Sequence, residues 1–129
     1  METEGNKEVI RRLYEEGFNS GTLTVVDEVV ADNVVLRGPA YGEGVRGAEA
    51  IETIKDEITD YHEEGRTIQI TYPEQIAEGE SVATRYMLDL SGRKFEGVSI
   101  AHFADGKIQE YFLVSEDSEP EQRKWAPHN

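Results

Sequence analysis

The sequence predicts an α+β domain in which helices come first and an antiparallel sheet follows. In the first half, apolar residues recur every three or four positions, which is the period of a helix with one buried face. After Gly65 the apolar period changes to two, which is typical of half-buried strands. A single domain over residues 1–117 accounts for this pattern, and the polar segment 118–129 is expected to be a mobile C-terminal tail.

Three helices are expected before the sheet. Their expected bounds are Lys7 to Phe18, Thr24 to Ala31 and Ala48 to His62. Asn6 and Thr24 are expected to cap the first two helices, because short polar side chains accept hydrogen bonds from the free amides of a helix start. Gly65 is expected to end the third.

Strands are expected wherever apolar residues alternate with polar ones. The expected segments are Asn33 to Arg37, Ile68 to Ile76, Ser81 to Leu90, Lys94 to Ala104 and Lys107 to Ser115. Turn dipeptides separate the last four, and the final two are Ser91-Gly92 and Asp105-Gly106. Consecutive strands of this kind form an antiparallel meander.

Composition excludes several classes of protein. The 129 residues hold 27 Asp and Glu against 13 Lys and Arg, a formal net charge of -14, and no cysteine. Disulfides and thiolate chemistry are therefore excluded, and a field of this sign repels nucleic acid and anionic membrane surfaces. Without an apolar run of membrane-spanning length or a basic leader, a cytoplasmic location is expected.

The excess of acids also suggests a salt-rich setting. Like charges destabilise a compact chain unless salt screens them, so the composition fits a halophilic source. An ordinary acidic protein of a mesophile is the alternative.

The order of elements resembles the SnoaL-like polyketide cyclases of the nuclear-transport-factor-two-like superfamily. The resemblance covers about Asn6 to Asp117 and includes the runs VVLRGP from Val34, VRG from Val45 and DGKI from Asp105. It implies a cone-shaped fold in which three N-terminal helices pack on a curved, mostly antiparallel sheet around a cavity. It also implies a homodimer through the convex sheet face, where His102 is expected.

The resemblance further implies where site residues lie. In related epoxide hydrolases an arginine is followed two residues later by a catalytic aspartate, so Arg85 is expected to face the cavity, with Met87 at the acid position. The second acid of the family falls at Leu113. Because both acids are replaced, epoxide hydrolysis and aldol cyclisation are not carried over.

Other residues then become candidates for chemistry. Asp89 shares the expected inner face with Arg85 and is the candidate base, and Tyr111 is the candidate catalytic hydroxyl. Arg37 and Arg85 would attract a carboxylate or enolate in an enclosed site. The alternatives are a solvated Asp89 beside its turn, and arginines that reach solvent.

Tyr14, Tyr41 and Tyr61 complete the expected ligand-binding set, either as cavity wall or as core packing. No metal-binding cluster or glycine-rich phosphate loop is found in the sequence, so no cofactor is expected. The resulting hypothesis is a cofactor-free isomerase, cyclase or hydrolase that moves protons on a small apolar ligand carrying a carbonyl or acid group. A non-catalytic ligand-binding protein and a dimerisation module are the alternatives.

Overall fold

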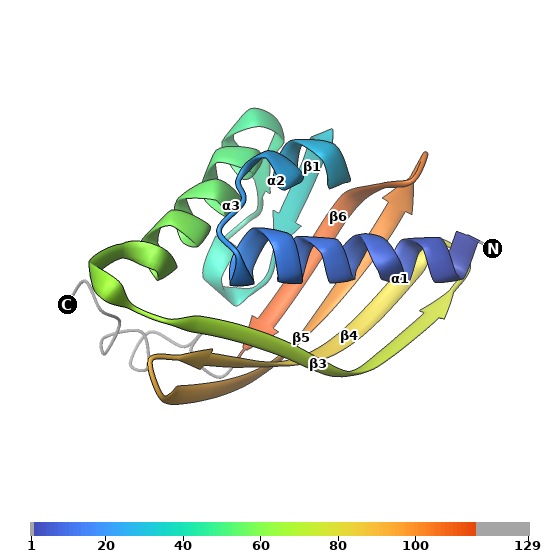
Figure 1. The fold of residues 1–129 in the computed structure, drawn as a ribbon. Helices are drawn as coiled ribbons and strands as arrows, with labels where there is room; N and C mark the ends of the chain where they lie inside the picture. Colours follow the sequence, from blue (N-terminus) through green and yellow to red (C-terminus); the bar gives the residue numbers. More distant parts are fainter. Residues whose placement is uncertain (1, 116–129) are drawn as a thin grey trace.

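The computed structural model describes residues 2–115 and shows helices packed on one face of a curved sheet (Figure 1). The helices are α1 (Glu2–Arg12), its π-helical continuation η1 (Leu13–Asn19), α2 (Thr24–Val29) and α3 (Gly47–His62), with 3-10 turns η2 (Pro39–Tyr41) and η3 (Glu63–Gly65). The strands are β1 (Val30–Arg37), β2 (Val45–Arg46), β3 (Ile68–Glu78), β4 (Ser81–Leu90), β5 (Arg93–Ala104) and β6 (Lys107–Ser115). The predicted cone-shaped α+β class is confirmed. The tail predicted over 118–129 lies outside the described residues.

The sheet has the strand order β2-β1-β6-β5-β4-β3. Strands β3 to β6 form the predicted antiparallel meander, whereas β1 lies parallel to β6. A parallel pair needs a long crossover, and here α3 and the strands after it supply that length. The helices pack against the concave face of the sheet (Figure 1).

Both predicted helix caps are wrong. The first helix begins at Glu2, and Asn6 lies inside it as a buried residue. The apolar stripe starts only at Val9, so hydrophobic periodicity could not mark the turns before it. Thr24 is the first residue of α2, whose N-cap is Leu23.

A π-helical segment, η1, carries the chain from α1 toward the sheet. Its side chains Leu13, Tyr14 and Phe18 are buried. At its end, the Asn19 amide donates to the Ile70 carbonyl at 3.1 Å and accepts from the Ile70 amide at 2.6 Å. These two bonds fix the end of η1 against β3, since an amide side chain can satisfy both backbone groups of one residue.

Strand β3 contains an irregularity that alternation alone does not predict. Ile68 and Ile70 are buried, but the pairing register with β4 shifts between Thr71 and Glu74. A β-bulge of this kind moves the following side chains to the other face. Ile76, predicted on the same face as Ile68, is therefore 60% exposed.

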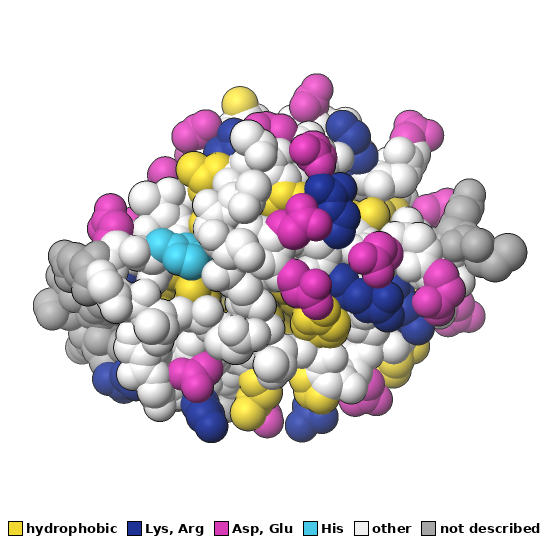
Figure 2. Space-filling model, in the orientation of Figure 1, with side chains coloured by type: hydrophobic (Ala, Val, Ile, Leu, Met, Phe, Trp, Pro, Cys, Tyr) yellow, Lys and Arg dark blue, Asp and Glu magenta, His cyan; other side chains and the backbone are white. Residues whose placement is uncertain are grey.

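The outer surface of the helices is strongly charged. Acidic and basic side chains are scattered over this face, and a few hydrophobic side chains are exposed among them (Figure 2). Arg12 pairs with Glu28 at 2.6 Å, and Lys55 pairs with Asp27 at 3.0 Å. The helices thus bury their apolar faces against the sheet, and the pocket lies between these two layers.

Candidate functional site

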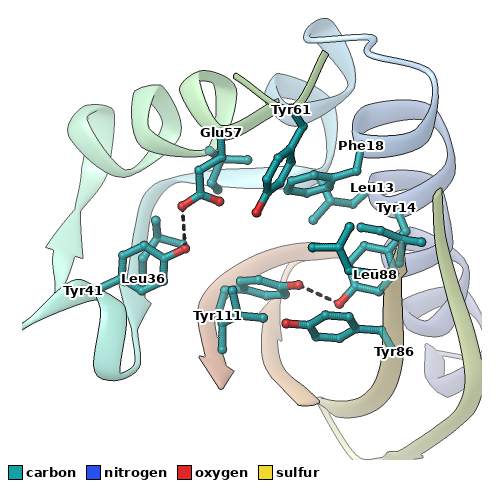
Figure 3. Close-up of a pocket in the computed structure, with 13 residues that line it drawn as sticks. Leu13, Tyr14, Phe18, Leu36, Tyr41, Glu57, Tyr61, Tyr86, Leu88 and Tyr111 are labelled. Carbon is teal, nitrogen blue, oxygen red and sulfur yellow. Dashed lines mark hydrogen bonds between the residues drawn. The ribbon is translucent and has the colours of Figure 1, made fainter. Parts of the chain in front are cut away.

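A pocket lies between the helices and the concave face of the sheet. The space between its side chains is about 520 Å³ when the open solvent at its mouth is included. Its polar lining consists of one carboxylate and five phenols, from Glu57, Tyr14, Tyr41, Tyr61, Tyr86 and Tyr111 (Figure 3). Leucine, isoleucine and phenylalanine side chains form the rest of the wall. Such a site suits a small, largely apolar molecule with a few polar groups.

Three hydroxyl groups meet on the sheet side of the pocket. The Tyr14 hydroxyl lies 2.7 Å from the Tyr111 hydroxyl (Figure 3). It also lies 2.8 Å from the Ser99 hydroxyl. All three residues are buried. Burial raises the pKa of Tyr14, although its hydrogen bonds to Ser99 and Tyr111 oppose that rise. Burial and the neighbouring Tyr14 also raise the pKa of Tyr111 well above its ordinary value, so both phenols stay protonated and able to donate.

The carboxylate of the pocket comes from α3. Ile54 and Ile58 of this helix are buried against the core, and Glu57, between them in sequence, lines the pocket. The Tyr41 hydroxyl donates to Glu57 Oε2 at 2.8 Å. Burial, followed by the negative charge of Glu57, raises the pKa of Tyr41. Tyr41 therefore holds the carboxylate in place as a neutral donor (Figure 3).

The aromatic rings support one another. The Tyr14 and Tyr86 rings meet edge to face with centroids 5.9 Å apart, and the Phe18 and Tyr61 rings lie 6.2 Å apart. Offset and edge contacts of this kind are the favourable geometries for aromatic pairs. The pocket wall is therefore preorganised by ring contacts as well as by hydrogen bonds.

The structure brings together most of the predicted ligand-binding side chains. Those that line the pocket as expected are Tyr14, Tyr41, Tyr61, Tyr111 and Leu113. They come from four different elements, namely η1, η2, α3 and β6. Tyr111 and Leu113 are two residues apart in β6, so both side chains lie on the same face of the strand.

The predicted inner face of β4 is wrong. Val82, Thr84, Tyr86 and Leu88 are buried on the cavity side, whereas Arg85, Met87 and Asp89 alternate with them and point to the opposite side. Arg85 has a side chain 52% exposed and lies 3.6 Å from Glu96 and 4.0 Å from Glu74. Asp89 accepts from the Gly92 amide at 2.9 Å in the turn that follows. Neither residue can act in the pocket.

Arg37 was also expected in the pocket and lies elsewhere. It donates to Glu110 on the convex face of the sheet. Glu110 lies 3.8 Å from His102 Nε2, and His102 Nδ1 lies 2.8 Å from the Ser81 hydroxyl. His102 therefore lies on the convex face, where the sequence predicted it, and Arg37 belongs to the same surface network.

The family model for the SnoaL-like domain matches residues 10–111 of the chain. The chain belongs to the SnoaL-like domain family. This confirms the resemblance drawn from the sequence, and no curated protein sequence matches the chain.

Solved structures show the same fold for this SnoaL-like domain. Bal32a, from a soil-derived mobile gene cassette, is 19% identical with a TM-score of 0.76, covering 97% of this chain and 99% of its own. An NTF2-like protein of unknown function from Mesorhizobium loti is 18% identical with a TM-score of 0.74, covering 90% and 94%. An LEH-like epoxide hydrolase from M. tuberculosis is 14% identical with a TM-score of 0.72, covering 90% and 86%.

Eight residues that line the pocket of the SnoaL-like domain were not among the predicted site residues, and Glu57, Tyr86 and Leu88 are three of them. Tyr86 and Leu88 belong to the more apolar of the two faces of β4. The alternation of apolar and polar residues in the sequence would have placed this face toward the pocket. Glu57 lies four residues before Tyr61, so both project from the same side of α3. That spacing was the available signal for the carboxylate.

The SnoaL-like domain offers no arrangement for a metal within residues 2–115, since no three His, Asp or Glu side chains there converge in a way that could hold an ion. Nor does any helix in that range have the length and apolar character needed to cross a membrane. The polar groups that line the pocket are the Glu57 carboxylate and the tyrosine hydroxyls.

Proposed function

We propose that this SnoaL-like domain catalyses cofactor-free proton transfer on a small apolar molecule that carries a carbonyl group. The supporting observation is the arrangement of the pocket's polar groups. Glu57, held by Tyr41 on the helix side, lies across the apolar space from the bonded hydroxyls of Tyr14 and Tyr111 (Figure 3). When Tyr14 donates to Tyr111, the Tyr111 hydroxyl is free to donate to a ligand, and a base opposite a neutral donor can form an enolate.

The proposed reaction needs no oxidant or cofactor. Glu57 accepts a proton from the carbon beside the carbonyl, and the electron pair of the broken C–H bond moves onto the carbonyl oxygen. The Tyr111 hydroxyl, hydrogen-bonded to Tyr14, donates to the oxygen as its negative charge develops. Returning the proton from Glu57 to a different carbon completes an isomerisation. In a cyclisation, the enolate carbon attacks a second carbonyl instead, and the resulting alkoxide takes the proton from Glu57.

Exchange of carbon-bound hydrogen tests this proposal directly. The probe is 2-tetralone, a bicyclic ketone, incubated in D₂O and followed by NMR. Glu57→Gln is expected to slow protein-catalysed exchange by about 10²–10⁴-fold, the usual range for a general base. Asp89→Asn is the matched control and should leave exchange unchanged, because Asp89 lies on the other face of β4. Equal exchange in wild type and Glu57→Gln would refute the proposal.

Non-catalytic binding is the second candidate function. It is favoured by Leu113, which lines the pocket with an apolar side chain at the position where the resemblance places a family acid. In that case 2-tetralone would raise the melting temperature of the domain without any protein-catalysed exchange. The same two measurements therefore distinguish the candidates.

We further propose that two copies of the chain pair through the convex sheet face. Val98, Phe112 and Val114 are 43%, 37% and 38% exposed, and Val98 pairs with Val114 in the sheet. Arg85 and Glu96 border this patch with opposite charges, so a two-fold related copy can present an acid to each arginine. Phe112→Lys should give a monomer by sedimentation analysis, whereas Leu23→Lys, an exposed leucine at the start of α2, should not.

A further inference from the structure

We infer that Tyr41 is the gate of the pocket. Its hydrogen bond to Glu57 closes the mouth, and a ligand enters when the short segment 39–44 swings outward. The inference rests on the proposed function in one respect, because it takes this pocket to be the site of a ligand. It adds the residue that controls how fast the ligand enters and leaves.

The burial of the lining side chains locates the mouth. Most of the residues that line the pocket are buried, including Tyr14 and Tyr111 on its sheet side. The lining residues that are partly exposed are Tyr41, Glu57, Tyr61 and Leu113. A pocket opens to solvent where its own wall is exposed, so the mouth lies among these side chains.

A hydrogen bond spans this mouth. The Tyr41 hydroxyl donates to Glu57 Oε2 at 2.8 Å and so joins η2 to α3 (Figure 3). Burial, followed by the negative charge of Glu57, raises the pKa of Tyr41, so the hydroxyl keeps the proton that it donates. A hydrogen bond to an ionised acceptor is stronger than a neutral one. The closed arrangement therefore lasts until this bond breaks.

The segment that carries Tyr41 has the properties of a moving part. The residues on either side of Tyr41 are exposed, whereas Tyr41 itself lines the pocket. A turn holds its backbone, in which the Tyr41 amide donates to the Gly38 carbonyl at 3.0 Å and the Gly44 amide donates to the Tyr41 carbonyl at 2.9 Å. Gly42 and Gly44 have positive φ angles of 59° and 110°, and glycine has the widest choice of backbone conformations. Exposed segments of this kind open more readily than the core.

Both ends of the segment are fixed, so the motion is local. At one end, a Cβ atom added to Gly38 would lie 2.1 Å from the Leu113 carbonyl oxygen, which shows how closely the two backbones approach. At the other end, Val45 pairs with Leu36 between β2 and β1. Residues 39–44 can therefore move without disturbing the sheet.

A gate changes binding kinetics in a different way from a side chain that only contacts the ligand. A gate that closes equally well with and without ligand slows entry and exit by the same factor, so the dissociation constant does not depend on it. A side chain that only contacts the ligand acts mainly on the dissociation rate constant. The two roles of Tyr41 are therefore separated by measuring both rate constants.

Stopped-flow fluorescence measures both rate constants with naphthalen-2-ylmethanol, a neutral two-ring alcohol. Tyr41→Phe keeps the ring and removes the hydrogen bond, so association and dissociation should both become about three- to tenfold faster. Tyr72→Phe is the matched control, because Tyr72 is also partly buried but does not line the pocket. It should leave both rate constants unchanged.

Gly42→Ala tests the motion of the segment without changing a side chain that lines the pocket. Gly42 has φ 59° and ψ -123°, which alanine rarely adopts, and nothing lies within 4 Å of an added Cβ. The strained closed turn should open more often, so both rate constants should again rise by about threefold or more. Gly79→Ala is the control, with the same φ and equally open surroundings in the turn between β3 and β4, and should leave both unchanged.

The kinetic outcomes decide the inference. It is supported when both rate constants rise together in Tyr41→Phe and Gly42→Ala while the dissociation constant changes by less than about twofold. Rate constants that stay the same in either variant, or a dissociation rate constant that rises alone, overturn it. Failure of the alcohol to bind overturns it as well.

The exchange of 2-tetralone tests the proposed function separately. Exchange that does not depend on Glu57 refutes proton transfer but leaves a gate with these kinetics standing. Exchange that is lost in Glu57→Gln, together with unchanged rate constants in Tyr41→Phe, refutes the gate alone.

Discussion

The phenol ring of Tyr86 lies directly against the backbone of Gly97 on the neighbouring strand. The two residues are paired in the register of β4 and β5. A Cβ atom added at Gly97 would lie 2.3 Å from the Cζ and hydroxyl oxygen of Tyr86, which no packing allows. Glycine at this position therefore lets the Tyr86 ring rest on the sheet and leaves the space above it open.

Gly97→Ala is expected to destabilise the fold and to narrow the pocket. The new methyl group must push the Tyr86 ring toward the pocket, and overpacking of this kind costs about 1–3 kcal/mol. Urea unfolding measures the free energy of unfolding, and calorimetry with naphthalen-2-ylmethanol measures the loss of affinity.

A double-mutant cycle identifies the ring as the cause. In a Tyr86→Ala background the added Cβ at Gly97 has no phenol to meet, so Gly97→Ala should cost clearly less there. Equal costs in both backgrounds would show that the penalty comes from the backbone of β5 instead.

The face of β4 shows where a resemblance can mislead. Alternation alone separates Val82, Tyr86 and Leu88 from Arg85 and Asp89, and the first set is the more apolar. The prediction followed a motif of related hydrolases instead and placed Arg85 inside. The burial pattern reverses it, because the apolar set of an antiparallel strand faces the core whatever its relatives carry.

The alternation of apolar residues and the glycine turns predicted the antiparallel meander well. They did not predict the π-helical segment or the β-bulge. The bounds of β4 and β6 agree with the sequence-based prediction, and glycine turns mark both ends of β4 and the start of β6. The π-helical turn of η1 and the register shift in β3 leave no periodic trace, so they could not be predicted. Glu57 was missed because carboxylates on a surface helix are usually solvated, and its spacing of four residues from Tyr61 was the one sequence signal that it lines the pocket.

Tyr14→Phe should destabilise the domain more than Tyr111→Phe. Removing the Tyr14 hydroxyl takes away its hydrogen bonds to both Ser99 and Tyr111. The buried hydroxyls of Ser99 and Tyr111 then each lose a partner, so the free energy of unfolding should fall by about 1–3 kcal/mol. Removing the Tyr111 hydroxyl leaves the bond between Tyr14 and Ser99 intact. Urea unfolding compares the two, and a larger loss in Tyr111→Phe would contradict Tyr14 as the centre of the network.

Gly38→Ala should be among the most damaging single substitutions at a turn. Gly38 has φ 133°, and an added Cβ would lie 2.1 Å from the Leu113 carbonyl oxygen. Relief requires β1 to move away from β6 beside the pocket, so a loss of about 2–4 kcal/mol is expected from strain and steric overlap.

Gly79→Ala is the control for the substitution at Gly38. Gly79 also has a positive φ, of 59°, but nothing lies within 4 Å of an added Cβ. The loss of stability in Gly79→Ala should come only from placing alanine in a left-handed backbone conformation, which costs about 1–2 kcal/mol. Similar melting temperatures for the two variants would contradict a steric role for Gly38.

Alkaline pH should weaken the fold through its buried phenols. Tyrosine ionises near pH 10 in an unfolded chain, and burial raises the pKa of Tyr14, Tyr41 and Tyr111 in the fold. Above about pH 10 the unfolded chain therefore loses protons first, and the stability that is complete below that pH falls by up to about 1.4 kcal/mol per pH unit for each tyrosine. Urea unfolding from pH 8 to 11 measures the slope.

Tyr111→Phe checks the source of the alkaline slope. The variant has one fewer raised phenol, so its stability should fall less steeply above pH 10 than that of the wild type. An unchanged slope would show that other groups control alkaline unfolding.

Salt should stabilise the domain, because its formal net charge of -14 repels itself when unscreened. The screening length falls from about 10 Å at 0.1 M salt to about 3 Å at 1 M, so the melting temperature should rise steeply between 0.05 and 1 M KCl and then level off. Sulfate strengthens apolar burial as well as screening, so a rise seen with sulfate but not with KCl would exclude charge repulsion as the cause. A melting temperature that is flat in KCl would also contradict the halophilic interpretation of the composition, since a chain that needs molar salt must gain stability from it.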